Sequence, residues 1–316
     1  MAEAQGTHQS EVSLAQARRI ERAQALARWN ATCEPLSNFV TRQTLDGLSS
    51  LTWDFVHDIP LLMWEVHHDG SRRLDFSLTE QPRSGARSPL LIPAIGMEYD
   101  FLDDGPVFMG HFVMTRAKSV TNVHRFTQNA LISAGSDVDL EANHAVAQLI
   151  DALGVPHFIG VTSRGSGTRL VINITQGETW QRAHAVLRAH GLPDEALMPT
   201  QIAGGLLDQG IALDLSIDVA GDRISHRAAM KLRALEMTDH KEQAISQALA
   251  TLGVPGSALQ EARPFLVMPT MHAPLDALDA PSTESPVTLR TSHVKVDLST
   301  DPPTLKSYLA CTSLQL

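Results

Sequence analysis

Paired segments of alternating apolar and polar residues recur five times in this chain of 316 residues. Each pair consists of two period-2 runs joined by a turn that contains Gly, Pro or Asp, which is the pattern of a β-hairpin. The five pairs span residues 61–68 with 72–79, 97–101 with 107–115, 157–163 with 168–174, 211–219 with 223–232, and 293–298 with 305–311. Helical patterns at 138–153, 177–190 and 239–252 separate several of them. The repeat predicts ten antiparallel strands combined with helices.

The two faces of these strands differ in polarity. In 211–219 every odd-numbered residue is Ile, Leu or Val, whereas Asp214, Ser216 and Asp218 occupy the other side. The apolar face needs helices to cover it. The polar face either contacts water in an open sheet or lines the interior if the hairpins close into a barrel.

The distribution of lysine favours the closed barrel. The chain has only five lysines, and Lys231, Lys295 and Lys306 lie on the polar face of the predicted strands. A solvated face would more often be rich in Thr, Lys and Glu without such a concentration of basic residues. An α+β protein with an open sheet and an unrelated function is the alternative.

Composition and charge narrow the class of protein. With 43% hydrophobic and 19% charged residues, the chain is neither a coiled coil nor disordered. The net charge of −10 argues against nucleic-acid binding. The two cysteines, Cys33 and Cys311, form no disulfide framework, and no apolar window is long enough to span a membrane. We expect a cytoplasmic protein with a disordered segment at 1–12 and one domain at 13–316.

Four stretches resemble the aromatic prenyltransferases of the αββα type, especially their small bacterial members that prenylate phenols, naphthols and phenazines. They are residues 73–77, 161–197, 211–232 and 293–312. The resemblance implies an α+β fold in which five αββα repeats form a closed ten-stranded antiparallel barrel with a polar lumen, surrounded by helices. It also implies a soluble enzyme that transfers a dimethylallyl or geranyl group from its diphosphate to an electron-rich aromatic acceptor, either a small molecule or a peptide side chain.

Prenyl transfer of this kind needs fixed positive charge around the departing diphosphate. The predicted diphosphate-binding residues are the basic side chains of the polar face together with one tyrosine: Arg73, Arg169, Arg227, Lys231, Lys295, Lys306 and Tyr308. The second hairpin lacks the lysine that this family usually has there. His111, Arg116 and Lys118 are its nearest substitutes.

The acceptor requires a pocket and a base that removes the ring proton. Glu65, Asp214 and His293 are the predicted catalytic residues, and His67 shares the polar face of the first strand with Glu65. The predicted walls of the acceptor and prenyl pocket are Met63, Met109, Val113 and Ser216. Each of these residues also has a purely structural interpretation as a packed or hydrogen-bonded side chain.

Asp75 is the candidate metal ligand. In the resemblance to aromatic prenyltransferases, it matches the position at which some members have an Asp that helps to hold Mg²⁺ beside the diphosphate. Mg²⁺ prefers carboxylate and phosphate oxygens as ligands. The alternative is an ion pair of Asp75 with Arg73 or Arg169. For the chain as a whole, the second functional hypothesis is a non-catalytic binding protein for an anionic or aromatic small molecule.

Overall fold

The computed structural model describes residues 61–71, 74–80, 94–102, 105–115, 121–162, 167–220, 223–234, 237–267, 271–273 and 287–313. The predictions for the segment 1–12 and for Arg73, Arg116 and Lys118 lie outside the described residues.

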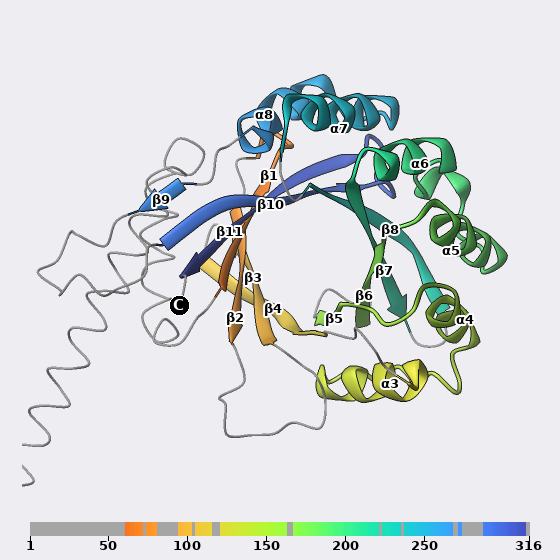
Figure 1. Ribbon diagram of the computed structural model, residues 1–316. Coiled ribbons are helices and arrows are strands. Elements are labelled where there is room, and N and C mark those ends of the chain that lie inside the picture. Colours follow the sequence, from red (N-terminus) through yellow and green to blue (C-terminus); the bar gives the residue numbers. More distant parts are fainter. Residues whose placement is uncertain are drawn as a thin grey trace, which may run out of the picture.

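Ten strands of the described chain form one closed antiparallel barrel (Figure 1). Each strand pairs with the next along the chain, β8 pairs with β10, and β11 pairs with both β10 and β1. The strands are β1 (Leu61–His67), β2 (Leu74–Glu80), β3 (Ala94–Leu102), β4 (Gly105–Met114), β5 (Phe158–Thr162), β6 (Gly167–Ile174), β7 (Ile211–Ala220), β8 (Arg223–Ala234), β10 (Val287–Asp297) and β11 (Thr304–Ser313). The short strand β9 (Met271–Ala273) pairs with the start of β10 outside the barrel.

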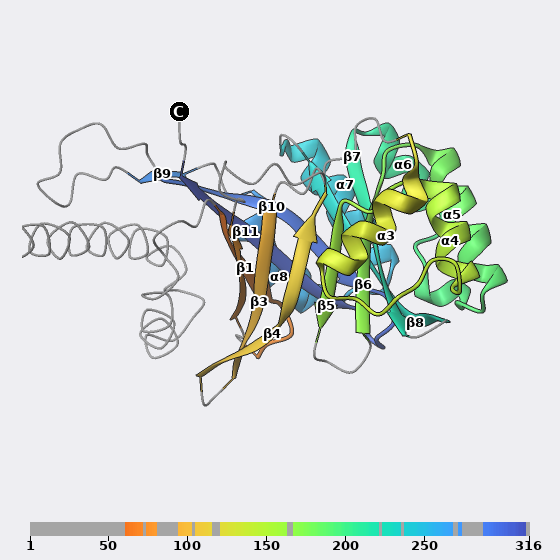
Figure 2. The same cartoon turned by 90° about the horizontal axis from the view of Figure 1, so that it is seen from below.

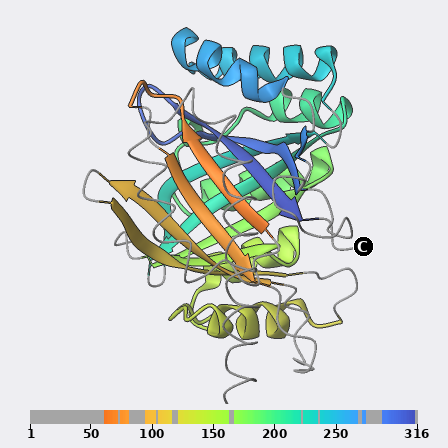
Figure 3. The same cartoon turned by 90° about the vertical axis from the view of Figure 1, so that its left-hand side faces the viewer.

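The pairing of β1 with β11 decides between the open sheet and the barrel. These strands pair from Leu61 opposite Thr312 to His67 opposite Lys306. Figure 3 shows the first hairpin, in orange, beside the last hairpin, in blue. The predicted closed barrel is therefore confirmed, and the open-sheet alternative is wrong.

Six α-helices of the described chain lie outside the barrel (Figures 1 and 2). They are α3 (Val123–Ser133), α4 (His144–Leu153), α5 (Gly177–Ala189), α6 (Thr200–Asp208), α7 (Asp239–Thr251) and α8 (Gly256–Leu266), and a 3₁₀ turn (Asp194–Ala196) precedes α6. The helices predicted at 177–190 and 239–252 are confirmed. The helix predicted at 138–153 begins only at His144, because the Asn143 side chain caps it by accepting from the Val146 N–H at 3.0 Å.

The main hydrophobic core lies between the outer face of the barrel and these helices. Leu170 and Ile217 from the strands and Trp180 and Leu187 from α5 are fully buried in it. The apolar face of the hairpins thus packs against helices, as the alternation predicts, and the polar face is left to line the lumen, the interior of the barrel.

A β-bulge in β4 corrects two predictions. Glu98 of β3 pairs with Gly110, but the next residue, Tyr99, pairs with Phe108, so Met109 has no partner in the ladder. Beyond the bulge the alternation is inverted. Val113 is therefore buried in the outer core opposite Ile159, and its predicted place in the pocket is wrong. His111 lies on the same outer side, exposed and against the ring of Phe108, so it does not replace the missing lysine.

Candidate active site

Three lysines form a continuous row across the lumen face of neighbouring strands. Lys231 of β8 lies opposite Lys295 of β10, which in turn lies opposite Lys306 of β11. Lys306 is also opposite His67 of β1, across the seam that closes the barrel. The register therefore brings together residues that are far apart in sequence. We call Lys231, Lys295 and Lys306 the lysine row.

A cavity opens beside this row and includes about 760 Å³ of empty space, part of it open to solvent. The predicted site residues that line it are Met63, Glu65, Asp75, Met109, Arg169, Lys295, Lys306 and Tyr308. They come from six strands, β1, β2, β4, β6, β10 and β11, whose lumen faces meet here.

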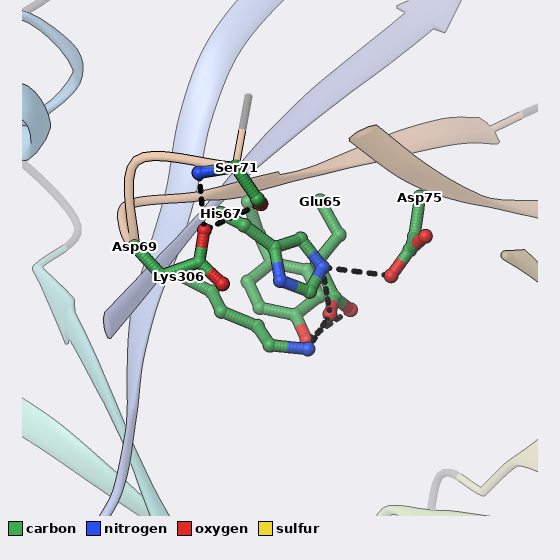
Figure 4. A network of polar contacts seen from close by, with 7 residues as sticks. Glu65, His67, Asp69, Ser71, Asp75 and Lys306 are labelled. Atoms are coloured by element: carbon green, nitrogen blue, oxygen red, sulfur yellow. Dashed lines mark hydrogen bonds and ion pairs between the residues drawn. The ribbon is translucent and has the colours of Figure 1, made fainter. Parts of the chain in front are cut away.

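Glu65 of β1 accepts hydrogen bonds from two of these residues. Lys306 Nζ donates to Oε1 (Figure 4). Tyr308 OH donates to Oε2. Burial alone would raise the pKa of Glu65, but Lys306 and His67 outweigh it and hold the pKa well below its usual range. Burial, and after it the carboxylate of Glu65, raises the pKa of Tyr308 well above 10. Glu65 is therefore ionised and Tyr308 is protonated at neutral pH.

His67 connects Glu65 to Asp75. Its Nε2 lies 2.7 Å from Asp75 Oδ2 and 3.5 Å from Glu65 Oε1 (Figure 4). Burial opposes protonation of the imidazole, but the two carboxylates outweigh it and raise the pKa of His67. The oxygen and nitrogen ligand atoms of Glu65, His67 and Asp75 all lie within 4.8 Å of one another. The first hairpin thus presents two carboxylates and an imidazole at one point of the lumen.

Lys231 and Lys295 have no carboxylate partner within 4.0 Å among the described residues. Lys231 Nζ instead lies 5.3 Å from the ring centre of Phe158 and 5.6 Å from that of Tyr308. Burial, followed by the positive charges of Arg169 and Lys306, lowers the pKa of Lys295 to about 7. Burial also lowers the pKa of Lys231. Lys295 is buried and Lys231 is half-buried opposite Asp214 of β7, and neither amine has a carboxylate of the described chain in direct contact, an arrangement that favours the binding of an anion.

Arg169 of β6 is held by Asp218 of β7. Its Nε and Nη2 donate to the two carboxylate oxygens at 2.8 and 3.3 Å, a bidentate arrangement. Burial opposes the charge of the guanidinium, but the bond with Asp218 outweighs it and raises the pKa of Arg169 above its ordinary value. Asp218 therefore fixes the direction in which Arg169 enters the cavity.

Asp214 belongs to a different group of residues. Its carboxylate accepts from Asn173 Nδ2 at 2.6 Å and lies 3.6 Å from Arg233 and 3.8 Å from His157. It does not line the cavity beside the lysine row. Ser216 is buried on the same face of β7 and does not line that cavity either. Asp214 therefore lies in a separate group of polar contacts and not beside Glu65 in the cavity wall.

His293 of β10 packs behind the cavity rather than in its wall. Its ring stacks on Tyr308 with centres 4.2 Å apart and planes at 15°, and its Nδ1 lies 3.0 Å from Ser292 Oγ. Burial, followed by the charges of Lys231, Arg233 and Lys295, holds the pKa of His293 well below its ordinary value. His293 is neutral and supports the ring of Tyr308. Arg227 lies in β8, but its side chain is outside the described residues.

Three acidic residues of the cavity wall are absent from the predicted site. Glu98, Asp100 and Asp297 line it together with Glu65 and Asp75, whereas its basic side chains are Arg169, Lys295 and Lys306. Among the described lining residues carboxylates thus outnumber cations. Asp297 could have been found, because it shares the face of Lys295 in the alternating run 293–298. Glu98 and Asp100 could have been found as well, because they alternate with Met97, Tyr99 and Phe101 in the run 97–101.

Comparison with known proteins identifies the fold. No protein-family model matches the chain, and no curated protein matches it significantly. The crystal structure of NotF in complex with brevianamide F and DMSPP covers 90% of this chain and 92% of its own, with a TM-score of 0.54 and 13% identity. AnaPT from Neosartorya fischeri covers 93% and 94%, with a TM-score of 0.55 and 12% identity. A second structure, of the NotF prenyltransferase, covers 90% and 92% at a TM-score of 0.51 and 11% identity.

The chain has the αββα barrel fold of aromatic prenyltransferases. In this barrel Lys295, Lys306, Arg169 and Glu65 line the lumen cavity, so the polar interior of the barrel is the candidate site. Among the described helices, none is both long and apolar enough to cross a membrane.

Proposed function

We propose that the protein transfers an allylic prenyl group, dimethylallyl or geranyl, from its diphosphate to an aromatic acceptor. The observation that carries this proposal is the lysine row, in which the buried Lys295 and the half-buried Lys231 have no carboxylate within 4.0 Å among the described residues. Burying such charges is costly unless an anion compensates them. The fold supports the reaction class, since the similar NotF structure holds DMSPP and brevianamide F.

The cations of the cavity act on the leaving group. As the allylic C–O bond breaks, negative charge grows on the diphosphate, and Lys295, Lys306 and Arg169 stabilise it. Tyr308 OH, protonated at neutral pH, supplies a neutral hydrogen bond to the same group. The aromatic ring then attacks the allylic cation, forming the new C–C bond and an arenium ion.

Glu65 takes the proton that the arenium ion loses. Lys306 and His67 hold its carboxylate ionised, so it is ready to accept the proton. Loss of the proton restores the aromatic ring, and the diphosphate leaves with the electron pair of the broken C–O bond and one more negative charge than it carried as the ester. Met63 and Met109 provide apolar wall on the same cavity and are the proposed contacts of the prenyl chain.

The first hairpin fits a divalent cation. Asp75, with Glu65 and His67 close by, offers the carboxylate oxygens that Mg²⁺ prefers. The excess of carboxylates among the lining residues would repel a diphosphate, and Mg²⁺ bound with the donor would offset this repulsion. We therefore propose Asp75 as the Mg²⁺ ligand, in competition with the hydrogen bond from His67 at 2.7 Å.

Equilibrium binding of dimethylallyl and geranyl thiolodiphosphates, with and without Mg²⁺, tests the donor site. We expect micromolar affinity for one of them. Incubation with the matching diphosphate and a panel of phenols, naphthols, indoles and tryptophan-containing peptides, read by mass spectrometry, then tests transfer. A prenylated product supports the enzyme. Donor binding without any product would favour the binding-protein alternative, and absence of donor binding by the folded protein would contradict both.

A further inference from the structure

Glu65 already occupies the donors that the proposed reaction assigns to the diphosphate. Lys306 Nζ and Tyr308 OH both donate to its carboxylate, one to each oxygen. Glu65 and Lys306 are each less than one-fifth exposed, so water does not compete strongly for these bonds. In the empty lumen the carboxylate therefore stands where an oxyanion of the donor substrate would otherwise be bound.

We propose that the carboxylate of Glu65 occupies the diphosphate site until the donor binds. The diphosphate then displaces Glu65, and the freed carboxylate binds the aromatic acceptor. The inference rests on the proposed function and deepens it, because it makes one residue serve both substrate sites in turn. It also gives Glu65 a positioning role before the acceptor ring loses its proton.

The exchange is chemically balanced. A carboxylate and a diphosphate present the same kind of anionic oxygen, so Lys306 and Tyr308 exchange one acceptor for another and lose no hydrogen bond. The displaced carboxylate would be costly to leave buried and alone. Two partners remain for it. His67 Nε2 lies 3.5 Å from Oε1, and an acceptor that carries a ring N–H or O–H supplies the other.

The exchange has a thermodynamic consequence. The donor, bound alone, must displace Glu65 from Lys306 and Tyr308 or bind without these two hydrogen-bond donors. The acceptor, bound alone, must draw Glu65 away from the same two residues or bind without its carboxylate. When both substrates are bound, that contact is broken once for the two of them. Donor and acceptor therefore bind with positive coupling, and the coupling is reciprocal. It also selects acceptors whose reacting ring bears a hydrogen-bond donor, such as phenols and indoles, over those that lack one.

Glu65→Gln tests the competition with the donor alone. Dimethylallyl thiolodiphosphate is the probe, titrated calorimetrically in the presence of EDTA and again with Mg²⁺. The amide cannot form the ion pair with Lys306, so we expect the probe to bind about tenfold more tightly to the variant in EDTA. Glu98→Gln is the matched control. It removes an equal charge from the same cavity wall, and Glu98 has no hydrogen bond with Lys306 or Tyr308.

A second variant distinguishes exchange from general electrostatics. In a Lys306→Met background the contested ammonium is absent, and Glu65→Gln should then change probe affinity no more than Glu98→Gln does. A gain that persists in that background, or equal gains from the two single variants, would overturn the exchange. Weaker binding by Glu65→Gln only with Mg²⁺ would also overturn it, by making Glu65 a metal ligand. No binding by wild type or any variant would instead reject the donor site, and with it the proposed function.

Discussion

Lys295 of β10 lies directly opposite Lys306 of β11, and Lys231 of β8 lies opposite Lys295 on its other side. Like charges placed opposite each other on neighbouring strands destabilise a sheet. The burial of Lys295 adds to the cost, since its ammonium loses hydration in the lumen. A bound anion would relieve this repulsion, and a strained site of this kind is the usual compromise between binding and stability.

Removing Lys295 should therefore stabilise the empty protein. We expect Lys295→Met to raise the free energy of unfolding by about 1–4 kcal/mol, the range found when buried ionic groups are replaced by apolar ones. In the folded state the pKa of Lys295 is about 7. An unfolded lysine titrates near pH 10.4, so the wild type gains stability as pH rises from 7 towards 10. The advantage of the variant is thus largest below pH 7 and shrinks above it.

Urea denaturation at pH 6.5 and pH 9 measures this difference. Lys295→Arg is the control, because it keeps the charge and should gain nothing at either pH. Equal stability of wild type and Lys295→Met at pH 6.5 would show that the buried ammonium has no net cost.

The pair formed by Arg169 and Asp218 should behave in the opposite way. Asp218→Asn leaves a buried guanidinium without its partner, and we expect a loss of about 3–5 kcal/mol in the free energy of unfolding. The double variant Arg169→Met/Asp218→Asn removes both charges and should recover most of that loss. Denaturation of the four proteins completes a double-mutant cycle. A double variant no more stable than Asp218→Asn would contradict the pairing.

Inner and outer faces of β4 are distinguished by a matched pair of substitutions. Val113→Thr places a hydroxyl in the outer core and should cost about 1–3 kcal/mol of stability, with little effect on the binding of dimethylallyl thiolodiphosphate. Met109→Thr should show the reverse, because Met109 lines the cavity. Thermal denaturation and a binding titration on both variants test the assignment. Loss of binding by a stable Val113→Thr would restore Val113 to the pocket.

The bulge in β4 shows where sequence alternation no longer predicts which side of the barrel wall a side chain lies on. Period-2 alternation places Glu65, Lys295, Lys306 and Tyr308 on the lumen face, and the structure agrees, because β1 with β11 and residues 293–297 of β10 with β11 pair without a register shift. Val113 fails because one unpaired residue inverts the alternation after it. Gly110, next to the unpaired Met109, is a local sign of such an insertion, but only the pairing with β3 shows that one is present.

The choice of partners within the lumen depends on closure of the barrel. Glu65 meets Tyr308 across 243 residues of sequence, through the register of β1 with β11. Alternation alone cannot say which carboxylate meets which cation. The helices show a related limit. Helix α6 contains Gly204 and Gly205, which weaken its local signal, and buried packing of its apolar side stabilises it instead.

Mg²⁺ should strengthen donor binding through Asp75. We expect removal of Mg²⁺ by EDTA to weaken the binding of dimethylallyl thiolodiphosphate at least tenfold, because the cation offsets the carboxylates of the cavity wall. Asp75→Asn should bind the probe with the same affinity with and without Mg²⁺. Calorimetric titration of both proteins under both conditions measures the effect. A wild type indifferent to EDTA would leave Asp75 as the hydrogen-bond partner of His67 only.

Lys295 should also make donor binding depend on pH. With its pKa at about 7 in the empty lumen, Lys295 is largely neutral at pH 8.5. A diphosphate beside the amine favours the ammonium, so the pKa rises in the complex. At a pH between these two pKa values, Lys295 takes up a proton when the donor binds. The contribution of Lys295 to the donor affinity therefore falls by up to about tenfold for each pH unit above 7. Below pH 7 the amine is already charged, and this contribution is constant.

Calorimetry at pH 8.5 in two buffers of different ionisation enthalpy measures how many protons the protein takes up when the donor binds. We expect about one proton taken up by the wild type with dimethylallyl thiolodiphosphate, since a single amine changes state. Lys295→Arg remains charged throughout the range and should take up close to none. Equal uptake by wild type and variant would assign the proton to another group of the cavity, such as His67, whose pKa is raised by its two carboxylates against the effect of burial. The affinity of the variant should accordingly stay level between pH 7 and pH 9, where that of the wild type falls.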